Sequence, residues 1–141
     1  MYHLMKIARE LASKAHAGQK RRGGLPYEIH AMNVGWKSFH NRDYTDAIVG
    51  FLHDTLEDTK LTVLDMREAG IPEECITAVV ALTKREGEGY NAYLLRVKAN
   101  PIARHVKVVD ICDNLGGIGS DPTPEQIKKY AFALQFLISD E

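Results

Sequence analysis

Apolar residues recur at intervals of three and four along almost the whole chain, the spacing that places them on one face of an α-helix. Glycines, prolines and short polar runs separate these stretches. The pattern predicts helices over residues 2–17, about 29–39, about 44–57, a short segment ending near Gly70, a segment from Pro72 through Leu82, residues 90–98, a segment from Pro101 through Leu115, and a last segment through Phe136 and Leu137.

Local signals mark several helix starts. Thr62 can cap the short helix that ends near Gly70, and Thr123 with Gln126 has the spacing of a capping box. The valine-rich stretch 106–111 would also fit a short strand, but its helical neighbours and the lack of a partner strand favour a helix. The fold class that follows is all-α, a single compact helical bundle.

Several segments between the helices are expected to be irregular. Residues 18–26 form a basic loop that is rich in glycine, and residues 41–43 have the composition of a turn. No linker or repeat divides the chain, so residues 1–141 are expected to form a single domain.

Composition limits the partners that the domain could have. The chain has 141 residues, 45% of them hydrophobic and 26% charged, with a formal net charge of −1. That balance gives no general attraction to nucleic acid or to an anionic membrane, so neither partner is expected. No membrane-length apolar run and no apolar leader is seen, and a cytoplasmic protein is expected. Cys75 and Cys112 lack the spacing of a zinc site and are expected to be reduced core residues.

The most informative segment is residues 53–59, where one imidazole and three carboxylates interrupt an apolar helical pattern. If this segment is helical, His53 and Glu57 lie one turn apart on a shared face, as do Asp54 and Asp58. Burial of so many ionisable groups is costly unless a metal ion or an opposite charge compensates them. The segment therefore predicts a metal site with acid/base groups beside it.

Residues elsewhere in the chain could complete this site. His30 follows the basic loop, and Asp110 interrupts an apolar stripe, where a carboxylate needs a partner. Two imidazoles and two carboxylates suit an ion such as Mn²⁺, Fe²⁺ or Zn²⁺. Glu57 and Asp58, close to those ligands, could then transfer protons as general acid or base.

In order and spacing these residues resemble the HD superfamily of metal-dependent phosphohydrolases. The fuller resemblance is to its RelA/SpoT-like branch, which includes the small alarmone hydrolases of the Mesh1 type, and it extends over roughly residues 5–137. The matching positions are His16 to Gln19, Arg21, Arg22, Pro26, Tyr27, His30, His53 to Thr59, Leu82, Thr83, Val106, Lys107, Asp110, Asp113 and Asn114.

The resemblance implies a metal site and a reaction. In such enzymes the positions of His30, His53, Asp54 and Asp110 hold Mn²⁺. The positions of Glu57 and Asp58 act on the attacking water and on the leaving group. The reaction removes the 3′-pyrophosphate of (p)ppGpp-like guanosine nucleotides and releases pyrophosphate.

The resemblance also implies a nucleotide site. The positions of Arg21 and Arg22 contact the nucleotide, and that of Asn114 lines the base pocket. Apart from the resemblance, Lys84 and Arg85 could reach a distal phosphate. Gly117 stands where long bifunctional enzymes of this branch carry a hydroxyl residue near the guanine.

Other interpretations of the same residues remain open. His53 and Asp54 could form a hydrogen-bonded structural pair, Glu57 and Asp58 could be solvated acids at a helix end, and Arg21 and Arg22 could lie in a solvated loop. A phosphatase of the same superfamily that acts on nucleoside monophosphates or another small phosphate ester is an alternative. A non-catalytic HD module that binds a nucleotide is another.

Overall fold

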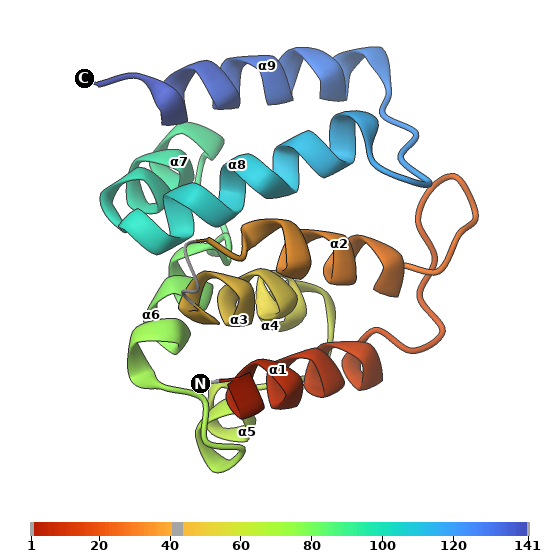
Figure 1. The fold of residues 1–141 in the computed structure, drawn as a ribbon. Coiled ribbons are helices and arrows are strands. Elements are labelled where there is room, and N and C mark those ends of the chain that lie inside the picture. The colour runs from red at the N-terminus through yellow and green to blue at the C-terminus, as the bar shows by residue number, and fades with distance from the viewer. Residues whose placement is uncertain (1, 41–43, 141) are drawn as a thin grey trace.

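The computed structural model describes residues 2–40 and 44–140, and the turn predicted at 41–43 lies outside them. The described residues form helices joined by short loops (Figure 1), and an isolated antiparallel bridge joins Lys20 and Pro26 in the basic loop. This confirms the predicted all-α fold. The helices are α1 (Tyr2–Ala15), α2 (Glu28–Ser38), α3 (Tyr44–Leu52), α4 (Thr55–Asp58), α5 (Val63–Glu68), α6 (Glu73–Ala81), α7 (Tyr90–Ala99), α8 (Pro101–Gly116) and α9 (Pro124–Ile138).

The short helix α3 lies at the centre of the bundle and packs against α1, α2, α6 and α8. Seven of its nine residues are buried and most of these are apolar, as expected for a helix with little solvent-facing surface. Helix α8 crosses next to α2 and α3, and α9 covers α8 on its far side (Figure 1). Residues from distant parts of the sequence, on α2, α3 and α8, are thereby brought to one place.

Two glycines allow α2 and α3 to approach closely. A Cβ atom at Gly35 would fall 2.1 Å from the Phe51 ring, and one at Gly50 would fall 2.9 Å from the Cα atom of Gly35. Side chains at these positions would force the helices apart. The close packing fixes α2, which carries His30, against the end of α3, which leads into His53.

The prediction of a single helix over residues 44–57 was wrong. Helix α3 ends at Leu52, His53 and Asp54 form a turn, and α4 follows from Thr55. Side chains form hydrogen bonds with carbonyl groups that would accept backbone N–H groups in a continuous helix. His53 Nδ1 lies 2.7 Å from the Gly50 carbonyl, and Thr55 Oγ1 donates to the Leu52 carbonyl at 2.8 Å. The four ionisable side chains of this segment therefore do not project from one helix edge.

Thr62 caps α5 as predicted, and does so in a capping box, and the predicted capping box at Thr123 is also present. Residues 106–111 lie within α8. Cys75 is buried as predicted, but the prediction for Cys112 was wrong, because its side chain is exposed on the outer face of α8. The adjacent Ile111 and Asp113 take the inward positions instead.

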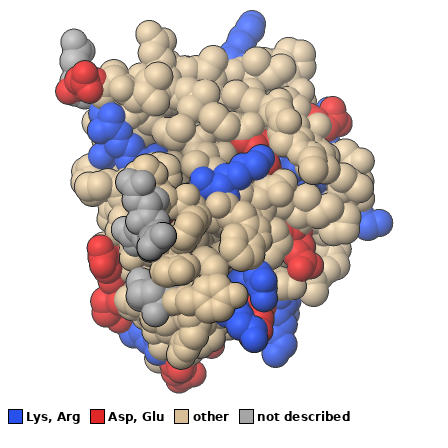
Figure 2. Space-filling model, in the orientation of Figure 1, with Lys and Arg blue, Asp and Glu red and all other residues tan. Residues whose placement is uncertain are grey.

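Charge and membrane character are unremarkable. Basic and acidic side chains are interspersed over the face in Figure 2, in keeping with a net charge of −1. None of the helices described is both long and apolar enough to cross a membrane.

Candidate active site

Three buried side chains from three segments meet at the junction of α2, α3 and α8. Each of His30, His53 and Asp110 offers a ligand atom within 4.8 Å of the others. The Asp110 Oδ1 atom lies 2.9 Å from His30 Nε2 and 3.2 Å from His53 Nε2. The two ring nitrogens thus converge on one carboxylate oxygen.

Asp54 stands at the edge of this cluster. Its Oδ1 atom lies 2.6 Å from His53 Nε2 and its Oδ2 atom 3.7 Å from His30 Nε2. The Tyr27 hydroxyl donates a hydrogen bond to the same carboxylate. The fold therefore brings together all four residues that the sequence suggested as metal ligands.

The surroundings of the two histidines fit a divalent metal ion. His30 Nδ1 is bonded to Asp113 Oδ2 at 2.7 Å, and His53 Nδ1 to the Gly50 carbonyl at 2.7 Å. When each Nδ1 donates to its acceptor, the Nε2 lone pair is directed into the cluster, the orientation that metal-binding histidines have. His30 Nε2 is buried and, within residues 2–40 and 44–140, has no partner of hydrogen-bond geometry.

Electrostatics in the cluster favour charged groups. Burial acts to lower the pKa of His53, but the neighbouring Asp54 and Asp110 outweigh it and hold that pKa well above the usual value. Burial likewise opposes ionisation of Asp54, yet His53 lowers the pKa of that carboxyl to about 2. The carboxylates are thus ionised and ready to accept a cation in place of the histidine protons.

Glu57 and Asp58 lie beside this cluster on α4. Partial burial raises the pKa of Glu57, and the Asp58 and Asp54 carboxylates raise it further. The pKa of Asp58 is also raised, first by burial and then by Asp54. The backbone carbonyl of Asp58 accepts a hydrogen bond from Gln19 Nε2 at 2.8 Å, which ties α4 to the basic loop.

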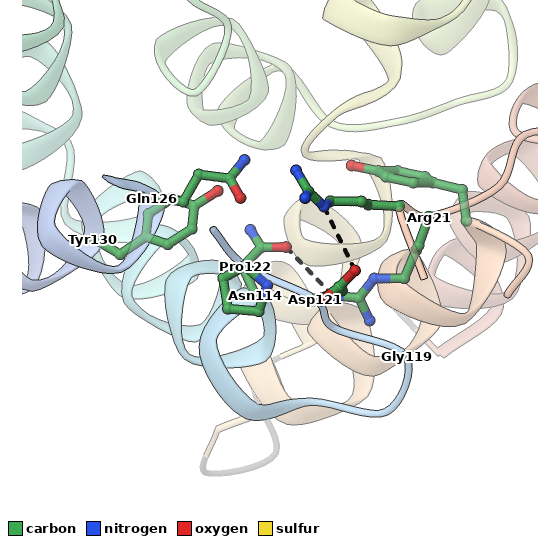
Figure 3. A pocket seen from close by; sticks show the side chains of 9 residues that line it. Arg21, Asn114, Gly119, Asp121, Pro122, Gln126 and Tyr130 are labelled. Atoms are coloured by element: carbon green, nitrogen blue, oxygen red, sulfur yellow. Dashed lines mark hydrogen bonds and ion pairs between the residues drawn. The ribbon is translucent and has the colours of Figure 1, made fainter. Parts of the chain in front are cut away.

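A cavity of about 110 Å³ opens next to the cluster (Figure 3). Side chains from the basic loop and α8 face Gln126 and Tyr130 of α9 across it. Its lining includes the three residues predicted to contact a nucleotide, Arg21, Arg22 and Asn114.

Arg21 is not part of a solvated loop, because it is only 8% exposed. Its guanidinium donates to the Ile118 carbonyl at 2.6 Å and lies 3.3 Å from Asp113 Oδ2. Arg22 is exposed and lies 3.5 Å from Asp121 Oδ2. Arg21 thus shapes the cavity wall, while Arg22 presents a solvated charge at its edge.

Asn114 connects the cavity to the candidate metal site. Its Nδ2 atom donates to Asp110 Oδ1 at 3.1 Å, and its Oδ1 atom accepts from Arg21 at 3.3 Å. One turn of α8 separates Asn114 from Asp110, as the sequence suggested.

Comparison with known proteins agrees with this geometry. The chain is 33% identical over 124 residues, 80% of its length, to a guanosine-3′,5′-bis(diphosphate) 3′-pyrophosphohydrolase of Aquifex aeolicus. It is 31% identical over 146 aligned residues, 92% of its length, to a protein of Oryza sativa named as a putative chloroplastic GTP diphosphokinase. These relatives support a RelA/SpoT-like protein of the HD type. No protein-family model matches it.

A solved structure shares the fold of this chain. The structure, described as a metazoan ortholog of SpoT that hydrolyzes ppGpp, superposes with a TM-score of 0.74 at 18% identity and covers 97% of this chain and 86% of its own. The chain spans less than a fifth of each of the two curated relatives, 18% and 16% of their lengths. The match therefore concerns one segment of those longer proteins.

Sequence reasoning gave no role in the site to several residues that shape it. Asp113 orients His30, and its position three residues after Asp110 in the buried stripe of α8 could have signalled this. Tyr27 donates to Asp54. Gln126 and Tyr130 line the cavity from α9, and only the tertiary packing of α9 on α8 places them there.

Proposed function

We propose that this chain hydrolyses the 3′-pyrophosphate of a (p)ppGpp-like guanosine nucleotide, with Mn²⁺ as its metal ion. The observation that carries the proposal is the meeting of His30, His53 and Asp110 within 4.8 Å, with an acidic pair beside them. The similarity to a named 3′-pyrophosphohydrolase over 80% of the chain supports the choice of substrate.

His30, His53, Asp54 and Asp110 would hold the ion. Two imidazoles and two carboxylates form a donor set suited to Mn²⁺, although the same set accepts other divalent transition ions. A bound ion of this kind lowers the pKa of a water molecule and neutralises charge on a phosphoryl group. Asp113 and the Gly50 carbonyl hold the two rings in the orientation that this requires.

Glu57 and Asp58 are proposed as the acid/base pair. Their raised pKa values lie closer to neutral pH than those of ordinary carboxyl groups, so each can hold or release a proton during a reaction. One carboxylate would take a proton from the attacking water, and the other would give a proton to the ribose 3′ oxygen.

The proposed reaction is a displacement at phosphorus, in which one P–O bond forms and one breaks. The water oxygen bonds to the inner phosphorus of the 3′-diphosphate, and the bond from that phosphorus to the ribose 3′ oxygen breaks. The products are pyrophosphate and a nucleotide with a free 3′-hydroxyl group. The protein takes little part in the covalent changes, so it contributes mainly by positioning the reacting groups and stabilising their charge.

The cavity beside Asp110 is proposed to receive the nucleoside. Arg22 offers a flat guanidinium for stacking or for contact with a 5′-phosphate, and Asn114 and Arg21 form the wall next to the metal site. A Cβ atom at Gly117 would fall 2.0 Å from Asp113 Oδ1, so no hydroxyl side chain can reach the base from that position. Base contacts would instead come from Asn114 and Gln126.

The decisive experiment is an assay of the purified chain with Mn²⁺ and ppGpp, with identification of the products by ion-exchange chromatography. Release of pyrophosphate and GDP is expected. Inorganic phosphate from nucleoside monophosphates, without pyrophosphate from ppGpp, would indicate a phosphatase of the same superfamily. Tight nucleotide binding without turnover under any divalent ion would indicate a non-catalytic module.

A further inference from the structure

About one turn of α8 before Asp110, basic side chains gather around two tyrosines. Lys107 Nζ lies 2.9 Å from Asp110 Oδ2 and 5.4 Å from the centre of the Tyr93 ring. Lys129 Nζ, from α9, lies 4.3 Å from the centre of the Tyr90 ring, and the two tyrosine rings are 6.0 Å apart. Two ammonium groups from different helices are therefore held over adjacent aromatic faces.

The lysines of this group make few direct ion pairs. Lys129 makes no ion pair with any residue that the structure describes, and Lys107 has Asp110 as its only carboxylate partner there. Partial burial lowers the pKa of Lys129, the positive charges of Lys107 and Lys84 lower it further, and the Glu57 carboxylate acts in the opposite direction. Positive charges this close to one another repel, and an anion that binds among them relieves the repulsion.

An unpaired hydroxyl lies in the same place. The Tyr90 hydroxyl oxygen is buried and has no hydrogen-bond partner in the described part of the chain. A buried donor without an acceptor is uncommon, and a ligand oxygen would satisfy it.

We propose that Lys107, Lys129 and the Tyr90 hydroxyl form a phosphate-binding subsite that holds the outer phosphate of a 3′-diphosphate, and afterwards the pyrophosphate product. The proposal rests on the function proposed above. Lys107, Asp110 and Asn114 follow one another along α8, so the subsite, the metal ligand and the nucleoside cavity lie in line over about 10 Å. A nucleotide with its base beside Asn114 would direct its 3′-diphosphate past Asp110 towards Lys107.

The test is the binding of inorganic pyrophosphate to the purified chain, measured by isothermal titration calorimetry in metal-free buffer. Lys129→Ala and Tyr90→Phe remove one charge and one hydroxyl. We expect Lys129→Ala to weaken pyrophosphate binding about tenfold and Tyr90→Phe about fivefold, the range for a hydrogen bond to a charged group. Lys128→Ala removes the neighbouring lysine of α9, which is exposed as Lys129 is, and should change binding less than about twofold.

Two outcomes would overturn the subsite: pyrophosphate that does not bind the wild-type chain, or an effect of Lys128→Ala equal to that of Lys129→Ala. Because this measurement needs no turnover, it separates the subsite from the proposed reaction. A chain that binds pyrophosphate through Lys129 but leaves ppGpp intact would refute the reaction and retain the subsite. If ppGpp is hydrolysed, Lys129→Ala should also raise KM for ppGpp and weaken inhibition by pyrophosphate.

Discussion

Asp113 and His30 are joined by a 2.7 Å hydrogen bond between Oδ2 and Nδ1, deep in the contact between α8 and α2. The same carboxylate lies 3.3 Å from Arg21 Nη1 and 3.4 Å from Lys37 Nζ. One buried acid therefore orients a candidate metal ligand and also holds the arginine that forms the wall of the nucleotide cavity.

Asp113→Asn tests this dual role. The substitution keeps the shape of the side chain but removes the charge that holds the His30 ring and the Arg21 guanidinium. Loss of such an outer partner typically costs about 10- to 100-fold in metal affinity. Mn²⁺ titration of the purified variant measures the effect. Asp121→Asn, which removes only an exposed partner of Arg22, is the matched control, and equal affinities of the two variants would contradict the role of Asp113.

Glu57→Gln separates chemistry from metal binding. The amide cannot accept or release the proton that a general acid or base must transfer, so the rate of pyrophosphate release should fall by about 10²- to 10⁴-fold. Metal content, measured by atomic emission, should be unchanged. Glu86→Gln, in the exposed loop before α7, should keep wild-type activity. A Glu57→Gln variant with full turnover would exclude this residue as acid or base.

Metal affinity should increase with pH. The pKa values of His30 and His53 are raised in the metal-free chain, because burial is outweighed by their carboxylate partners. A cation must displace the protons that these rings hold, so binding weakens as pH falls and the rings protonate. Calorimetric Mn²⁺ titrations from pH 6 to 9 should show an apparent affinity that rises up to about tenfold per pH unit for each proton displaced. An affinity independent of pH would mean that both rings are already neutral.

The crossing of α2 and α3 should tolerate no side chain at Gly35. The added Cβ atom of Gly35→Ala would meet the Phe51 ring at 2.1 Å, and overpacking of this kind costs about 1–3 kcal/mol. Gly116→Ala is the control, since nothing lies within 4 Å of its Cβ position. Urea unfolding of both variants measures the difference. Metal affinity should also fall in Gly35→Ala, because the same crossing aligns His30 with His53.

The ion pair between Glu88 and Arg96 should stabilise the fold down to acidic pH. The hydrogen bond from Arg96 Nη2 to Glu88 Oε1, 2.7 Å long, holds the pKa of Glu88 at about 2. Because the folded-state pKa is below the unfolded value, this stabilisation is complete above about pH 4.5 and is lost as pH falls to about 2. Thermal melts of wild type and Glu88→Gln should differ at pH 6 and converge at pH 2. A difference in melting temperature that persists at pH 2 would show that the charge of Glu88 is not the cause of the difference.

Most of the helices could be predicted because their signals are local. The apolar stripes of α1 and α8 and the capping boxes at Thr62 and Thr123 depend on residues within a few positions of one another. The break after Leu52 could not be predicted, since the apolar pattern continues through it. The break depends on His53 and Thr55 side chains bonding to backbone carbonyls, in competition with the helix.

The sequence by itself determined the all-helical fold class and the types of residue available for chemistry: imidazoles at 30 and 53, carboxylates at 54, 57, 58 and 110, and a basic loop before them. Only the tertiary structure decided how these groups meet. The 2.9 Å approach of His30 to Asp110, the burial of Arg21, and the placement of Lys129 over Tyr90 all join residues far apart in sequence. Periodicity describes which face of a helix is apolar, whereas contacts between helices depend on how those faces pack, as at the glycines of α2 and α3.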